Sequence, residues 1–196
     1  MSYQRLLIVF ILWLMVLVPS SYAAIGIATI KGTAKDSPIV GSASFMETND
    51  GLQLEASVAN VPEGKHGFHI HEKGDCGDEG KAAGGHFNPG KVAHGFLPKD
   101  GALHSHAGDM GNIEVGSDGI GKISEFLPGV HLIGKEPSVA GLAVILHEKE
   151  DDFGQPTGNA GGRIGCGIIM IQDEGSATAE APMKDEPMAK VEPESK

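Results

Sequence analysis

The chain has 196 residues, of which 29 are Gly, 11 are Pro and only 2 are Cys. This length suits one domain with short extensions, and it is long enough to bury a hydrophobic core. The formal net charge of −11 argues against a nucleic-acid-binding protein, whose surface would be basic, and two cysteines form neither a disulfide-dense scaffold nor a tetrathiolate zinc site.

The N-terminal segment, residues 1–23, predicts a secretory signal peptide. Arg5 precedes an apolar run from Leu6 to Val18, and small residues stand before a cleavage site after Ala23. The run is shorter than the roughly 20 residues that a membrane-spanning helix needs, which favours cleavage over an uncleaved anchor. We therefore expect an exported protein that is free of the membrane after cleavage.

Export bears on the two cysteines, Cys76 and Cys166. Outside the cytosol two thiols tend to pair, so we favour a disulfide between them over two separate buried thiols. Such a bridge would close a loop of about 90 residues, which in the chain-entropy description stabilises a fold by about 4–5 kcal/mol.

The body of the chain, residues 24–172, alternates apolar and small or polar residues with a period of two. This pattern predicts short β-strands, and Asn49-Asp50-Gly51 and Ser117-Asp118-Gly119 are hairpin turn signals between them. Eight such strands predict an all-β, antiparallel sandwich or barrel. The expected strands are Ile25–Thr29, Ile39–Phe45, Leu52–Val58, Phe68–His71, Ile113–Val115, Ile120–Ile123, Ala140–Leu146 and Ile164–Ile171.

Three stretches of the body do not fit strands. Residues 72–109 are rich in Gly and His, and a loop of this length needs something to order it, such as a metal ion or a disulfide. Residues 127–137 and 148–162 are shorter connections. Beyond the body, residues 173–196 lose all apolar periodicity and predict a disordered acidic tail.

Histidines are the most informative residues, because most of the nine lie between His66 and His106. His69 and His71 are two apart in a predicted strand, so their side chains leave the same face and can share a metal, although alternating His can also form a polar outer face. Three imidazoles and a carboxylate fill a tetrahedral zinc shell, whereas all-imidazole ligation suits copper among other metals. Further candidate ligands are His86, His94, His106, Asp109 and His147.

Four segments carry these residues in a fixed order. They are Gly67-Phe68-His69-Ile70-His71-Glu72 followed by Gly74-Asp75-Cys76; Gly85-His86-Phe87-Asn88-Pro89 with His94 and His106-Ala107-Gly108-Asp109; Val144 to Lys149; and Gly158 to Gly167. Together they resemble the two signatures, the zinc loop and the last copper-binding strand of the copper–zinc superoxide dismutase family. The resemblance covers nearly all of residues 24–172. It implies an eight-stranded antiparallel Greek-key β-barrel with a long metal-binding loop, copper and zinc as cofactors, and conversion of superoxide to dioxygen and hydrogen peroxide.

The resemblance also implies roles for individual residues. Copper would be bound by His69, His71, His86 and His147, and zinc by His86, His94, His106 and Asp109, so that His86 bridges the two ions and takes part in catalysis. Asp151 would hold one histidine of each site, and His66 would support them without binding metal. The His-x-x-Asp spacing favours His106 over His104 as a ligand. Arg163 would guide the anionic substrate, and His131, away from the motifs, is interpreted as a surface residue.

The chain departs from the family's eukaryotic members after Asp152. Only Phe153 to Thr157 stand where those members carry a longer, charged loop thought to help steer superoxide, and the candidates for the missing charge are Lys91, Lys99 and Lys149. The short loop and the export signal resemble bacterial members, which implies the periplasm or, alternatively, the extracellular medium, and a monomer or a homodimer. An alternative hypothesis is a metal-sequestering or copper-delivery module on the same fold without turnover.

Overall fold

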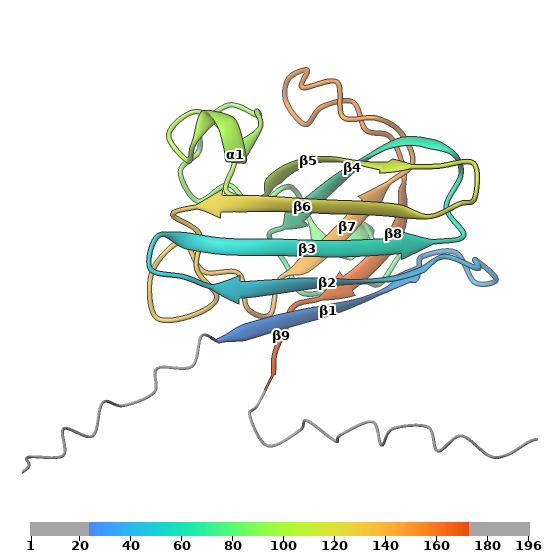
Figure 1. The fold of residues 1–196 in the computed structure, drawn as a ribbon. Coiled ribbons are helices and arrows are strands. Elements are labelled where there is room, and N and C mark those ends of the chain that lie inside the picture. The colour runs from blue at the N-terminus through green and yellow to red at the C-terminus, as the bar shows by residue number, and fades with distance from the viewer. Residues whose placement is uncertain (1–23, 173–196) are drawn as a thin grey trace, which may run out of the picture.

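Nine antiparallel β-strands make up the computed structural model, which describes residues 24–172 (Figure 1). The predicted signal peptide and the predicted acidic tail lie outside the described residues. The strands are β1 Ile25–Gly32, β2 Val40–Glu47, β3 Gly51–Ala59, β4 Gly64–His71, β5 Asp109–Val115, β6 Gly121–Pro128, β7 Ala143–His147, β8 Arg163–Ile168 and β9 Met170–Ile171.

Eight of these strands close into a barrel. Their order is β2-β3-β6-β5-β4-β7-β8-β1, and β1 pairs again with β2, so no long edge is left open. The connection from β3 to β4 passes β6 and β5, and the connection from β6 to β7 passes β5 and β4, which is Greek-key topology. Figure 1 shows the barrel flattened into two layers, with β4, β5, β7 and β8 behind β1, β2, β3 and β6. The predicted all-β fold is confirmed.

The alternation in the sequence separates core from solvent along the strands. In β3, Leu52, Leu54 and Val58 are buried while Glu55 and Ser57 between them are exposed. All five residues of β7 are buried, as its continuous apolar run predicted. Each buried Leu or Phe stabilises the fold by about 1.5–3 kcal/mol through the apolar surface removed from water.

Several predicted elements differ in detail from the structure. The strands β4, β5 and β6 are longer than the expected Phe68–His71, Ile113–Val115 and Ile120–Ile123. The expected strand Ile164–Ile171 is divided into β8 and β9, because the buried Ile169 pairs instead with the turn before β7: its N–H donates to Leu142 O at 2.9 Å and its O accepts from Gly141 N at 2.7 Å. The long loop also contains two short helical turns, η1 Lys81–Ala83 and α1 Leu97–Asp100, where no element was expected.

The interpretation of His131 as a surface residue was wrong. Its side chain is 8% exposed, and its Nδ1 lies 2.6 Å from Glu47 Oε1 at the end of β2. The other Glu47 oxygen accepts the Leu132 N–H at 2.6 Å. The fully buried Val130 and Leu132 on either side of His131 hold this connection against the barrel, so His131 is covered as well.

The two remaining long connections lie on the same side of the barrel, at the top of Figure 1, where α1 marks the long loop and the orange segment is the loop after β7. The predicted disulfide joins Cys76 in the long loop to Cys166 in β8, with Cα atoms 5.8 Å apart. Among residues 24–172, no helix has the length and apolar character needed to span a membrane.

Candidate metal centre

Seven polar side chains from distant parts of the chain converge in two buried groups. Within each group, one candidate ligand atom per residue lies within 4.8 Å of all the others. His86 belongs to both groups. The first group is His69, His71, His86 and His147, and the second is His86, His94, His106 and Asp109.

Strand geometry places the first group. His69 and His71 leave the same face of β4, and β4 pairs with β7, whose last residue is His147. The pairing of β7 with β8 shifts register between Leu146 and His147. The side chain of His147 therefore does not have to follow the regular alternation of the apolar residues before it. An isolated bridge between His71 and His86 brings the long loop onto the end of β4.

In the first group, one ring nitrogen of each β4 histidine contacts an oxygen outside the group, and the other nitrogen remains on the side of the group. His71 Nδ1 lies 3.0 Å from Gly84 O, and its Nε2 lies 3.3 Å from His147 Nε2. His69 Nε2 lies 2.8 Å from Asp151 Oδ2, and its Nδ1 is buried with no hydrogen-bond partner among the described residues. A buried nitrogen without a partner is costly, so a cation placed between these rings fits the arrangement.

Three imidazoles of the first group, those of His71, His86 and His147, are held neutral. Burial, assisted by the neighbouring imidazoles, lowers the pKa of His71 to about 2 and that of His147 to about 3. Burial also lowers the pKa of His86 to about 4, against the opposing hydrogen bond with Asp109. Neutral imidazole is the form that binds a metal, so these rings carry free lone pairs at neutral pH.

Asp109 organises the second group. Its Oδ1 lies 2.9 Å from His86 Nδ1 and 3.0 Å from His106 Nδ1, and its Oδ2 lies 2.9 Å from His94 Nδ1. The backbone N–H groups of Gly95 and His106 each donate to Oδ2 at 2.9 Å. Burial favours protonation, but the hydrogen bonds from the three histidines hold the pKa of Asp109 well below its usual range. His104 is exposed and lies outside the group, so the structure brings His106 and not His104 to Asp109.

Asp151 connects the two groups. Its Oδ2 lies 2.8 Å from His69 Nε2, and its Oδ1 lies 2.9 Å from His94 Nε2. Although burial acts in the opposite direction, the contacts with Asp109 and Asp151 raise the pKa of His94 to about 9. A cation between His94 Nδ1 and Asp109 would therefore take the place of a proton. Gly158, with a φ of 75°, is required here, because a Cβ at this position would collide with Asp151 and His94.

With this geometry in view, comparison with known proteins decides the family. The profile of the family described as copper/zinc superoxide dismutase (SODC) matches residues 39–169. The chain belongs to the copper/zinc superoxide dismutase family. This finding agrees with the four motifs and with the two ligand groups.

Individual relatives of this superoxide dismutase family member support the assignment. Proteins named extracellular superoxide dismutase [Cu-Zn] from Caenorhabditis elegans and Drosophila melanogaster are 43% and 40% identical to it, over 69% and 68% of this chain. The match spans 63% of the nematode protein, less than two thirds of its length, and 77% of the fly protein. A crystal structure described as that of the clock protein EA4 superposes with a TM-score of 0.68 at 34% identity, covering 78% of this chain and 97% of that one.

Two further residues expected from the superoxide dismutase motifs border the groups. His66 is buried, with Nδ1 2.9 Å from His147 O and Nε2 2.9 Å from Pro62 O, and it belongs to neither group. Arg163 donates from Nη1 to Gly80 O at 2.6 Å and from Nη2 to Gly84 O at 2.5 Å. After burial and the neighbouring imidazoles, its charge also lowers the pKa of His71 and His147, which places the guanidinium beside the first group.

The sequence did not point to Asn112 of β5 as a residue that supports the site. Its Nδ2 donates to Asp151 O at 2.9 Å, and its Oδ1 accepts the Asp151 N–H at 2.7 Å. This pair of bonds fixes the main chain of Asp151. Asn112 stands directly before the expected strand Ile113–Val115, and no pattern around it in the sequence points to this role.

Proposed function

We propose that this family member is an exported superoxide dismutase in which His69, His71, His86 and His147 bind copper while His86, His94, His106 and Asp109 bind zinc. The observation that carries the proposal is the position of His86, which is shared by the two buried groups. Its Nδ1 lies beside Asp109, which leaves Nε2 for the other group. A module that stored a single kind of ion would need no such shared imidazole.

Copper, when bound, supplies the one-electron oxidation and reduction that convert two superoxide anions and two protons into dioxygen and hydrogen peroxide, and zinc supplies a redox-inactive charge. The protein's part is positioning and proton handling. His86 Nε2 is the atom that can take up a proton and deliver it to the reduced product, while Nδ1 keeps its place beside Asp109 at 2.9 Å. Asp151 keeps His69 oriented through Nε2 at 2.8 Å.

Arg163 is the residue that attracts the anionic substrate in this proposal. The chain is acidic overall, with a formal charge of −11, so the local positive charge beside the first group has to act within the Debye length of about 8 Å in physiological salt. Because the guanidinium donates to two backbone carbonyls, its charge stays at a fixed place beside the first group. Fixed charge costs no reorganisation when the substrate arrives.

The disulfide and the names of the relatives support the proposal that the protein is exported. The relatives from Caenorhabditis elegans, Haemonchus contortus and Drosophila melanogaster are named extracellular, which agrees with an exported protein, and the Cys76–Cys166 bridge suits an oxidising compartment. We propose the periplasm or the extracellular medium as that compartment. A monomer or homodimer stays a prediction.

Pulse radiolysis of the protein loaded with copper and zinc tests the function, with metal content measured by elemental analysis on the same sample. We expect one copper and one zinc per chain and superoxide consumption that continues over many turnovers. Consumption that stops after one equivalent per bound copper would instead identify a metal store. If the protein took up no copper after incubation with both metals, the ligand assignment would be refuted.

A further inference from the structure

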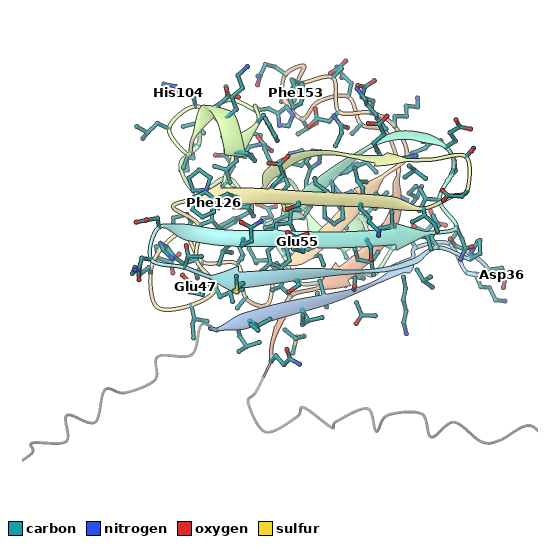
Figure 2. The ribbon with its side chains drawn as sticks, viewed as in Figure 1. Asp36, Glu47, Glu55, His104, Phe126 and Phe153 are labelled. Carbon is teal, nitrogen blue, oxygen red and sulfur yellow. A yellow bond between two sulfur atoms is a disulfide. The ribbon has the colours of Figure 1, made fainter. Side chains whose placement is uncertain are left out.

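The short loop after β7, residues 152–158, contacts the zinc group through side chains that the family motifs do not include. Figure 2 labels Phe153 in this loop, on the same side of the barrel as His104 of the long loop. The two residues of this loop that contact the long loop are Phe153 and Gln155. Both contact His94, the one histidine that faces Asp109 and Asp151 together.

Gln155 binds the main chain of His94 at two points. Its Oε1 accepts the His94 N–H at 3.0 Å, and its Nε2 donates to His94 O at 2.8 Å. Within residues 24–172, no other hydrogen bond involves the backbone N–H or O of His94. His94 belongs to no helix or strand, so this side-chain amide takes the place of the missing ladder partner.

The Phe153 ring lies beside the His94 ring. The two rings are nearly parallel, at 20°, with centroids 6.4 Å apart, and Phe96 of the long loop lies 6.0 Å from the Phe153 ring. The Phe153 backbone has a φ of 59°, a region that side-chain-bearing residues rarely adopt. In this conformation its N–H donates to Asp151 Oδ1 at 2.8 Å, so one residue contacts both His94 and the carboxylate that holds it.

The loop that carries these two residues is ordered by its own bonds. Asp152 Oδ1 accepts the Gly154 N–H at 2.8 Å, and Asp152 also accepts from Asn159 Nδ2 at 3.1 Å. The Asp152 N–H donates to Gly158 O at 2.9 Å, and the Gly158 N–H donates to Gly154 O at 2.6 Å. These bonds join residues of the loop itself into a small closed turn. Because the loop is ordered by its own hydrogen bonds, its contacts with His94 restrain the position of that residue.

We propose that Gln155 and Phe153 act as positioning residues that clamp His94 and thereby slow the release of zinc. The proposal rests on the proposed function, because it takes His86, His94, His106 and Asp109 as the zinc ligands. Release of zinc requires His94 to turn away from Asp109. The amide bonds and the Phe153 ring both oppose that movement, so their removal is expected to raise the dissociation rate.

The test loads zinc alone into the full chain and follows its transfer to an excess of a coloured chelator at fixed pH. Gln155→Met keeps the length of the side chain and removes both hydrogen bonds, and we expect zinc release about tenfold faster, at the low end of the effect of groups that orient metal ligands. Thr157→Ala is the matched control, because Thr157 is exposed in the same loop and makes no side-chain hydrogen bond among the described residues. Its release rate should equal that of the wild type.

Phe153→Gly separates the ring from the backbone, since glycine accepts a φ of 59° without strain. We expect faster zinc release together with a metal-free melting temperature that does not fall. As a spectroscopic readout, Co²⁺ in place of zinc should give a visible spectrum that changes in Gln155→Met and not in Thr157→Ala.

Release from Gln155→Met within twofold of the wild-type rate would overturn the clamp. It would also be overturned if the variant's only effect were an equal fall in the melting temperatures of the metal-free and zinc-loaded protein, because the loop would then be a general stabiliser. A wild-type chain that binds no zinc would count against the proposed function instead, so the two failures are distinguishable.

Discussion

Removal of the Cys76–Cys166 bridge is the change whose magnitude follows most directly from the structure. The two cysteines are 90 residues apart in sequence. In the chain-entropy description, closing a loop of this size restricts the unfolded chain and stabilises the fold by about 4–5 kcal/mol. For a domain of this size, each kcal/mol corresponds to about 2–4 °C in melting temperature. We therefore expect Cys76→Ala/Cys166→Ala to melt roughly 8–20 °C below the wild type.

The same substitution has a local effect on the long loop. Cys166 stays within β8, where it pairs with Ile145 on one side and Lys31 on the other, so alanine there leaves the barrel intact. Cys76 instead loses the anchor of its loop. Gly80 and Gly84, the acceptors for Arg163, lie in this loop, so the guanidinium should become less fixed in the double variant.

The assay is thermal unfolding of the metal-free proteins, followed by circular dichroism or calorimetry, because bound metal would add its own stabilisation. Wild-type protein treated with a reductant should melt at the temperature of the double variant. Cys76→Ala alone serves as a control that cannot form the bridge and keeps Cys166. A fall of less than about 3 °C in the double variant, well below the range from loop closure, would refute the argument.

Other predictions address the site. Asp151→Asn should weaken both copper and zinc binding by about 10–100-fold in chelator competition, because an amide cannot accept from His69 and His94 together; weakening of one ion only would contradict the bridging role. His147→Ala should abolish turnover in pulse radiolysis while circular dichroism shows the fold retained, and full activity would refute its place among the copper ligands. Arg163→Ala should lower kcat/KM and flatten its dependence on salt, and an unchanged salt profile would exclude steering by this residue.

The two buried groups of side chains could be predicted because their signal lies in short segments. The alternation of β4 places His69 and His71 on one face whatever the rest of the chain does. The remaining ligands were assigned by resemblance to an ordered set of motifs. No local pattern relates Asp151 to His69, which are 82 residues apart, so this contact is set by the pairing of β4 with β7.

His131 and Gln155 show what a sequence leaves undetermined. Each is a single polar residue in a Gly- and Pro-containing loop, a setting typical of solvent-exposed side chains. His131 is buried by a partner 84 residues earlier, and Gln155 bonds to a backbone 61 residues earlier. Such contacts depend on how two loops meet after the barrel has closed, and neither residue's neighbours in sequence carry that information.

The structure also explains how the barrel tolerates so many buried polar side chains. His71 and His66 are tied to backbone carbonyls, and His69 and His94 to Asp151, which leaves the other nitrogen of His69 and of His94 facing inward. The inward His69 Nδ1 makes no hydrogen bond among the described residues, and such a buried nitrogen costs about 1–3 kcal/mol, whereas His94 Nδ1 lies 2.9 Å from Asp109 Oδ2. A bound cation would remove that cost, so metal binding and fold stability are coupled, and the outer hydrogen bonds orient the rings that would hold the cation.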